Sequence, residues 1–149
     1  MDVATILSAK GSNVKVTWPW ARVQEVVVRL AGPPPIGALV VVDEERRVVG
    51  MISERDIIRS MAWWTEGSRP YPTEQTVAEV MTPRPPTCSP GDSLTVLMQR
   101  MTTTRCRHLP VLDHGRLVGL VSIGDVVLHR VREMTLESDV LRDLYLSSR

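Results

Sequence analysis

The 149-residue sequence lacks several features by which whole classes of protein are recognised. Its longest purely apolar runs, such as 38–42, span about five residues, far fewer than a membrane-spanning helix needs. No basic stretch leads into an apolar one near the N-terminus, so we expect no signal peptide. Eighteen Lys and Arg residues against seventeen Asp and Glu leave a net charge of +1, which does not favour a broad surface for nucleic acid.

Cysteine and catalytic motifs are also scarce. The two cysteines, Cys88 and Cys106, show neither CxxC spacing nor a disulfide framework, so a reducing, cytoplasmic location is expected. The motifs HExxH, GxSxG and GxxxxGK[ST] are missing. Cys106 lies two positions from His108, a spacing that is common on strands and does not by itself indicate a thiol nucleophile. We therefore expect no enzyme, no metal site and no required cofactor.

What the sequence does contain is an internal repeat. Residues 48–58, VVGMISERDII, return as LVGLVSIGDVV at 117–127, an offset of 69 residues. Residues 38–43 match 108–113 at an offset of 70. The two leading segments, 3–7 and 77–81, agree at an offset of 74. Between leader and strands, two apolar quartets match at an offset of 71: Val23, Val26, Val27 and Leu30 with Leu94, Leu97, Met98 and Met101.

The repeat predicts the secondary structure of each half. Both apolar quartets have the i, i+3, i+4, i+7 spacing of a buried helix face. The strands predicted near 38–42, 48–52, 109–112 and 117–121 are uniformly apolar, which indicates sheets covered on both faces. Each half is thus a leader, a helix, two strands and a second helix. One such unit of about 60 residues would have a marginal core, so we expect the two to pack face to face.

The repeat also suggests a division of the chain. We expect a first unit with its leader over 1–64, a linker over 65–76, a second unit over 77–132 and a helical extension over 133–149. Trp63 and Trp64 at the linker are expected to serve packing. The final helix continues to about Tyr145 with a partial apolar stripe that would pack on a second copy of the chain, giving a homodimer. The stripe consists of Val127, Val131, Met134, Leu141 and Leu144 or Tyr145.

The repeated segments resemble a known family. GALVVVD…VVGMISERDI in the first half and RHLPVLD…GRLVGLVSIGDVV in the second are similar to tandem cystathionine-β-synthase (CBS) domains, a pair called a Bateman module. The resemblance runs from about Val3 to Arg132, and the opening ILSAKG resembles small stand-alone bacterial CBS-pair proteins. It implies an α/β fold in which two βαββα units pack by their sheets around a pseudo-twofold axis. It also implies that adenosine-containing ligands bind in the clefts between the units.

Two Ser-x-x-Asp pairs are candidate binding residues. Ser53 with Asp56, and Ser122 with Asp125, each follow an apolar strand and open a helix. In one interpretation the serine and the helix N-terminus meet a phosphate, while the aspartate accepts hydrogen bonds from ribose hydroxyls. In the other, each pair is a capping box that stabilises its helix without a ligand. The resemblance favours binding and adds Arg55, although the family more often has threonine in place of these serines.

The second half has a basic segment, Arg105–His108, directly before a strand. Guanidinium groups at Arg105 and Arg107 suit phosphate oxygens, and the His108 imidazole can donate a further bond. The family places phosphate contacts here, and the alternative is a solvated loop.

The equivalent first-half stretch, 33–38, has no basic residue, so the two clefts cannot be chemically equal. Because the basic segment belongs to the second half, we expect Asp125 to contribute more to nucleotide binding than Asp56.

Further candidates rest on the resemblance. It implies that the segment around Thr87 and Ser89 meets the adenine edge and approaches the phosphates. Lys10, one of only two lysines, either reaches a phosphate or is simply exposed. Trp18 either stacks on the base or fills the cleft. The starts of the two central strands add Gly37, Ala38 and Pro110.

Three hypotheses follow for the function. The leading one is a regulatory module that senses an adenine nucleotide and transmits its occupancy to a protein partner or to its own oligomer. AMP is the first choice of ligand, followed by ATP, NAD(H) and S-adenosylmethionine. A ligand-independent dimeric adaptor is the alternative, and a nucleotide-processing enzyme using Asp125 is the third.

Overall fold

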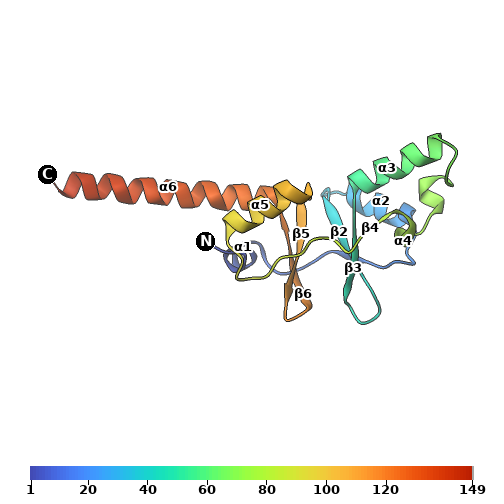
Figure 1. Cartoon of the computed structure of the whole chain (residues 1–149), viewed down its shortest axis with the longest axis horizontal. Coiled ribbons are helices and arrows are strands. Elements are labelled where there is room, and N and C mark those ends of the chain that lie inside the picture. The colour runs from blue at the N-terminus through green and yellow to red at the C-terminus, as the bar shows by residue number, and fades with distance from the viewer. Residues whose placement is uncertain (149) are drawn as a thin grey trace.

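A computed structural model describes residues 1–148 as a mixed α/β fold. The elements along the chain are α1 (Val3–Lys10), β1 (Val16–Thr17), α2 (Val23–Ala31), β2 (Ala38–Val42), β3 (Val48–Ser53), α3 (Glu54–Thr65), the 3-10 turn η1 (Pro72–Glu74), α4 (Val77–Val80), β4 (Thr82–Pro83), α5 (Leu94–Thr104), β5 (His108–Asp113), β6 (Arg116–Ser122) and α6 (Ile123–Ser147). Figure 1 shows the two sheets side by side at the centre, with α1, α5 and α6 flanking one and α2, α3 and α4 flanking the other. The repeat of helix, hairpin and helix is therefore confirmed.

The central strands are covered on both faces, as their apolar sequences predict. All five residues of β2 are buried. Leu39 and Val41 pack with the helices of the first half. Val40 is 0% exposed, and the alternation of side chains along a strand directs it to the opposite face of the sheet. The two sheets differ in size, because the first has the order β1-β2-β3-β4 and the second consists of β5 and β6.

The two leading segments are exchanged between the halves. Val3 and Ile6 of α1 are buried in the core of the second half, whereas Val77 and Val80 of α4 are buried in the core of the first. Equivalent backbone hydrogen bonds fix both leaders, from Ala4 N–H to the Pro90 carbonyl and from Ala78 N–H to the Pro19 carbonyl, each 2.9 Å long. The sequence-based division assigned the first leader to the first half and the second leader to the second half. In the structure each leader packs in the core of the other half.

Equivalent glycines in β3 and β6 make the exchange possible. A Cβ atom on Gly50 would lie 2.4 Å from Met81 Sδ, and one on Gly119 would lie 2.4 Å from Leu7 Cδ2. Both distances are far below van der Waals contact, so each leader packs where a side chain is missing. The repeated glycine is thus explained by packing.

The final helix is as long as its pattern predicts. α6 has 25 residues and extends away from the paired sheets in Figure 1. An ion pair of 2.7 Å joins the N-terminal ammonium of Met1 to Glu133. Beyond it the apolar side chains are exposed, for example Leu141 at 67%. The predicted extension ends at Arg149, which lies outside the described residues. Within 1–148, no helix combines the length and apolarity that crossing a membrane would require.

Candidate functional site

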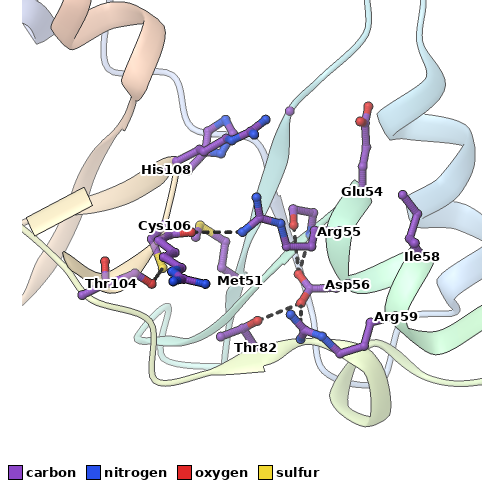
Figure 2. Close-up of a pocket in the computed structure, with 14 residues that line it drawn as sticks. Met51, Glu54, Arg55, Asp56, Ile58, Arg59, Thr82, Thr104, Cys106 and His108 are labelled. Atoms are coloured by element: carbon purple, nitrogen blue, oxygen red, sulfur yellow. Dashed lines mark hydrogen bonds and ion pairs between the residues drawn. The ribbon is translucent and has the colours of Figure 1, made fainter. Parts of the chain in front are cut away.

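The first Ser-x-x-Asp pair forms a hydrogen-bonded cluster at the start of α3. Oδ2 of Asp56 accepts hydrogen bonds from the Ser53 N–H at 2.8 Å and the Ser53 hydroxyl at 3.1 Å. Oδ1 accepts one from the Thr82 hydroxyl at 2.8 Å and one from Arg59 at 3.3 Å. Figure 2 shows Thr82 and Arg59 directed toward Asp56, and all three residues line one cavity. The carboxylate of Asp56 therefore helps to cap the helix, as the second interpretation expected, and also lines the cavity.

This first cavity, of about 680 Å³, lies between the two halves. Its predicted lining residues come from both: Gly37, Ser53, Arg55 and Asp56 from the first, and Arg105, Arg107 and His108 from the second. Arg55 crosses from one half to the other, donating to the Arg105 carbonyl at 3.1 Å. Residues more than 40 positions apart in the chain thus share one basic, concave surface.

The structure corrects the expected pairing of the basic segment with Asp125. Arg105 and Arg107 line the cavity of Asp56 instead. The reason is the face-to-face packing of the sheets, which sets the start of β5 opposite the start of α3. The first cavity consequently combines a Ser-x-x-Asp pair from one half with a strand start from the other. The two clefts are chemically unequal in the structure, and the basic segment lies at the one that Asp56 lines.

The second Ser-x-x-Asp pair forms a reciprocal capping box at the start of α6. Asp125 Oδ2 accepts from the Ser122 N–H at 2.9 Å, and the Ser122 hydroxyl accepts from the Asp125 N–H at 3.1 Å. Lys10 Nζ donates to the same Oδ2 at 2.7 Å and to the Leu120 carbonyl at 3.0 Å. Burial alone would raise the pKa of Asp125, but the Lys10 and Ser122 bonds outweigh it and lower that pKa below 3.8.

A cavity of about 500 Å³ beside the first is lined by Arg55, Arg105 and Arg107. The second cavity at a Ser-x-x-Asp pair is smaller, about 270 Å³, and is lined by Ser122 but not by Asp125. The predicted residues that line it are Lys10, Gly37, Ala38, His108 and Ser122. Gly37 and His108 border both cavities. A Cβ atom on Gly37 would lie 2.6 Å from His108 Nε2, so the imidazole sits directly against the glycine backbone. Burial, followed by the positive charge of Lys10, lowers the pKa of His108, which keeps the ring neutral near pH 7.

Other predicted site residues serve the fold in this structure. The Thr87 carbonyl accepts a 2.6 Å bond from Arg100, and the Ser89 N–H donates to Asp92 at 3.1 Å, so both belong to the turn before α5. Pro110 is paired with Leu120 inside the second sheet.

The predicted roles of three tryptophans, Trp18, Trp63 and Trp64, can be compared with their positions in the structure. Trp18 is 42% exposed, lies beside Trp20 with ring centroids 6.4 Å apart, and lines neither the first nor the second cavity. Trp64 packs edge-on against Tyr71 at 5.0 Å, and Arg69 covers the Trp63 ring at 4.8 Å. The expected packing role of the linker tryptophans is therefore confirmed.

Sequence reasoning missed several residues of the first cavity. The most consequential is Thr82, because β4 is only two residues long and leaves no periodic signal. Arg59 could have been found, since it lies three positions after Asp56 on one helix face. The remaining additions are Met51, Glu54, Ile58, Thr104 and Cys106.

Comparisons with known proteins identify the family of the chain. The CBS domain family matches residues 14–62 and 77–132. The mitochondrial CBS domain-containing protein CBSX3 of Arabidopsis thaliana is 33% identical over 138 residues, covering 88% of this chain and 65% of that protein. The first three curated relatives are matched over 37% to 65% of their own length.

Solved structures give the same result. The CBS-domain protein ATU1752 of Agrobacterium tumefaciens has a TM-score of 0.78 and 36% identity, with 87% of this chain and 92% of that chain covered. The CBS domain protein PAE2072 of Pyrobaculum aerophilum, described as complexed with AMP, has a TM-score of 0.73 and 25% identity over 93% of this chain and 99% of that chain. The chain therefore belongs to the CBS-domain family and contains two copies of the domain in tandem.

Proposed function

We propose that the protein is a regulatory module that binds an adenine nucleotide in the first cavity. The observation that carries the proposal is the meeting of Asp56 with Arg105 and Arg107 in one cavity of about 680 Å³. That volume falls within the range of about 300–1,000 Å³ typical of small-molecule sites. The similarity to a protein described as complexed with AMP supports the choice of AMP as first ligand.

The lining residues can serve each part of a nucleotide. The carboxylate of Asp56 would accept hydrogen bonds from the ribose diol in exchange for its bonds to neutral Thr82 and to Arg59. The phosphate would lie near the guanidinium groups of Arg105 and Arg107. The apolar side chains of Met51 and Ile58 provide the surface against which a purine could lie.

The charge of the cavity favours an anionic ligand. Four lining residues carry a guanidinium group, Arg55, Arg59, Arg105 and Arg107, whereas only Glu54 and Asp56 carry a carboxylate. The excess of positive charge suits AMP, ATP or NAD(H) and disfavours S-adenosylmethionine, whose sulfonium is itself a cation. We place AMP first and the other phosphate-bearing ligands after it.

Calorimetric titration with AMP and adenosine tests the phosphate contact. Arg107→Ala should weaken AMP binding about tenfold to 150-fold, the equivalent of about 1.5–3 kcal/mol for one charged hydrogen bond. Adenosine affinity should be unchanged, because adenosine has no phosphate. Arg107→Lys should restore binding only in part, since an ammonium cannot form the two-pronged contact. The control is Arg116→Ala, an exposed arginine in the β5–β6 hairpin. Unchanged AMP affinity in Arg107→Ala would contradict the proposal.

We propose further that two copies form a homodimer through the exposed faces of α3 and α6. Met61 of α3 is 43% exposed, and Val131 of α6 is 56% exposed. Light scattering should show a particle of twice 16.7 kDa. Val131→Glu should dissociate it, whereas Leu136→Glu, about 140° around the same helix, should not. A parent particle of monomer mass would contradict the proposal.

The dimer offers a route by which occupancy could be transmitted. Asp56 in the first turn of α3 lines the cavity, while Met61, further along the same helix, is 43% exposed on the outside. A ligand that shifts this turn would move the proposed contact between copies. We also propose a cytoplasmic location, because both cysteines are free thiols. Chromatography of AMP after incubation with the protein should recover AMP unchanged, and a product would indicate an enzyme instead.

A further inference from the structure

The two leaders are equivalent by sequence but differ in length. Leu7 and Met81, which pack against the paired glycines, match at the leader offset of 74, whereas Thr17 and Cys88, which pair with β2 and β5, match at 71. The first leader therefore has three more residues between these two points. It uses the additional length to continue α1 as a helix to Lys10.

The second leader takes a different path. After Met81 it turns into β4, whose Thr82 and Pro83 pair with β3 at the edge of the first sheet. The result is a four-stranded first sheet beside a two-stranded second sheet. At the first cavity, the second leader is an edge strand that supplies Thr82. At the second cavity, the equivalent part of the first leader is the end of helix α1, which supplies Lys10.

This difference changes what each aspartate binds. Asp56 accepts a hydrogen bond from Thr82, a neutral hydroxyl of the second leader. Asp125 is instead bound by Lys10, a cation of the first leader, at 2.7 Å, and the same Nζ donates to the Leu120 carbonyl at 3.0 Å. Two bonds hold the ammonium in place on the carboxylate, although the Lys10 side chain is 39% exposed.

The cavity beside Lys10 is also the smaller of the two. The first, at about 680 Å³, lies well inside the range of about 300–1,000 Å³ for small-molecule sites, and the second, at about 270 Å³, lies below it. Arg59 also contacts Asp56, but at 3.3 Å and from the same helix, and it leaves the larger cavity open.

We infer that Lys10, by binding the Asp125 carboxylate, blocks nucleotide binding there, so that each chain binds one adenine nucleotide at Asp56 and none at Asp125. The inference rests on the proposed function. A ribose diol would have to displace an ammonium that is tethered to the chain and so present at high effective concentration. A nucleotide bound at Asp125 would also need the space that the Lys10 side chain takes up.

The stoichiometry of AMP binding by calorimetry tests this inference. The parent chain should bind one AMP, and Lys10→Ala should bind two. Lys10→Arg, which keeps a cation on a long side chain, should bind one. The matched control is Arg84→Ala, which removes the exposed cation at the equivalent position of the other leader and should leave the value at one. Circular dichroism melting checks that each variant is folded.

Two double variants locate the additional site. Lys10→Ala with Asp125→Asn should return to one AMP per chain, and Lys10→Ala with Asp56→Asn should retain one, now at Asp125. Two AMP molecules on the parent, or one on folded Lys10→Ala, would overturn the inference while leaving the proposed function intact. A parent that binds no AMP would overturn the proposed function, and a single site appearing in Lys10→Ala would then still support the role of Lys10.

Discussion

The strongest consequence of the fold concerns the two aspartates of the repeated Ser-x-x-Asp pairs. They occupy equivalent positions in sequence, yet Asp56 faces the basic segment and Asp125 faces Lys10. We predict that Asp56→Ala weakens AMP binding strongly and that Asp125→Ala changes it less than twofold. The comparison is informative because both substitutions remove the same group from the same place in a helix.

The magnitude follows from the contacts. A carboxylate that accepts hydrogen bonds from a ribose contributes about 1.5–3 kcal/mol, or about tenfold to 150-fold in affinity. Asp56→Ala should also lower the free energy of unfolding, because its side chain is only 5% exposed and its oxygens accept four hydrogen bonds. The Asp125 side chain is 23% exposed and should matter less for stability.

Calorimetry with AMP gives the affinities, and urea denaturation without ligand gives the stability of each variant. Asp56→Asn, which keeps one acceptor oxygen and the helix cap, separates loss of binding from loss of folding. The reasoning is refuted if Asp125→Ala weakens AMP binding as much as Asp56→Asn does in proteins that are equally folded.

Two further predictions concern the wall between the cavities. Gly37→Ala would place a Cβ atom 2.6 Å from His108 Nε2, so we expect the imidazole to be displaced and the free energy of unfolding to fall by about 1–3 kcal/mol. Adding His108→Ala should recover most of that loss. A Gly37→Ala protein as stable as the parent would count against this packing. The lowered pKa of His108 means that, between that value and 6.5, the unfolded chain binds more protons, so stability should rise with pH through this window. Urea midpoints measured from about pH 5 to about pH 7.5 should show the rise in the parent and a smaller one in His108→Gln, and equal slopes would contradict it; the lowered pKa of Asp125 acts at more acidic pH, below 3.8.

The sequence by itself determined the repeat and the type of each element. Periodic apolar residues predict α2 and α5, uniform apolar runs predict the two hairpins, and the continued helical pattern predicts α6. These features depend on neighbours within about a dozen residues, which is the range over which propensity and side-chain spacing act. The Ser-x-x-Asp caps at the starts of α3 and α6 are local in the same way.

Only the tertiary structure decided which parts meet. The exchange of leaders joins Met81 to Gly50, 31 positions apart. The pairing of Asp56 with the basic segment and the contact of Lys10 with Asp125 join residues 49 or more positions apart. No local periodicity encodes such contacts, because they arise when two sheets pack face to face around a pseudo-twofold axis. The sequence contains one sign that the two leaders differ, the change of repeat offset from 74 to 71, which means three more residues in the first leader. What these residues do depends on the path that they take in the folded chain. In this protein they prolong a helix and carry a lysine onto the second aspartate, and that difference in path makes two similar sequences into two unequal sites.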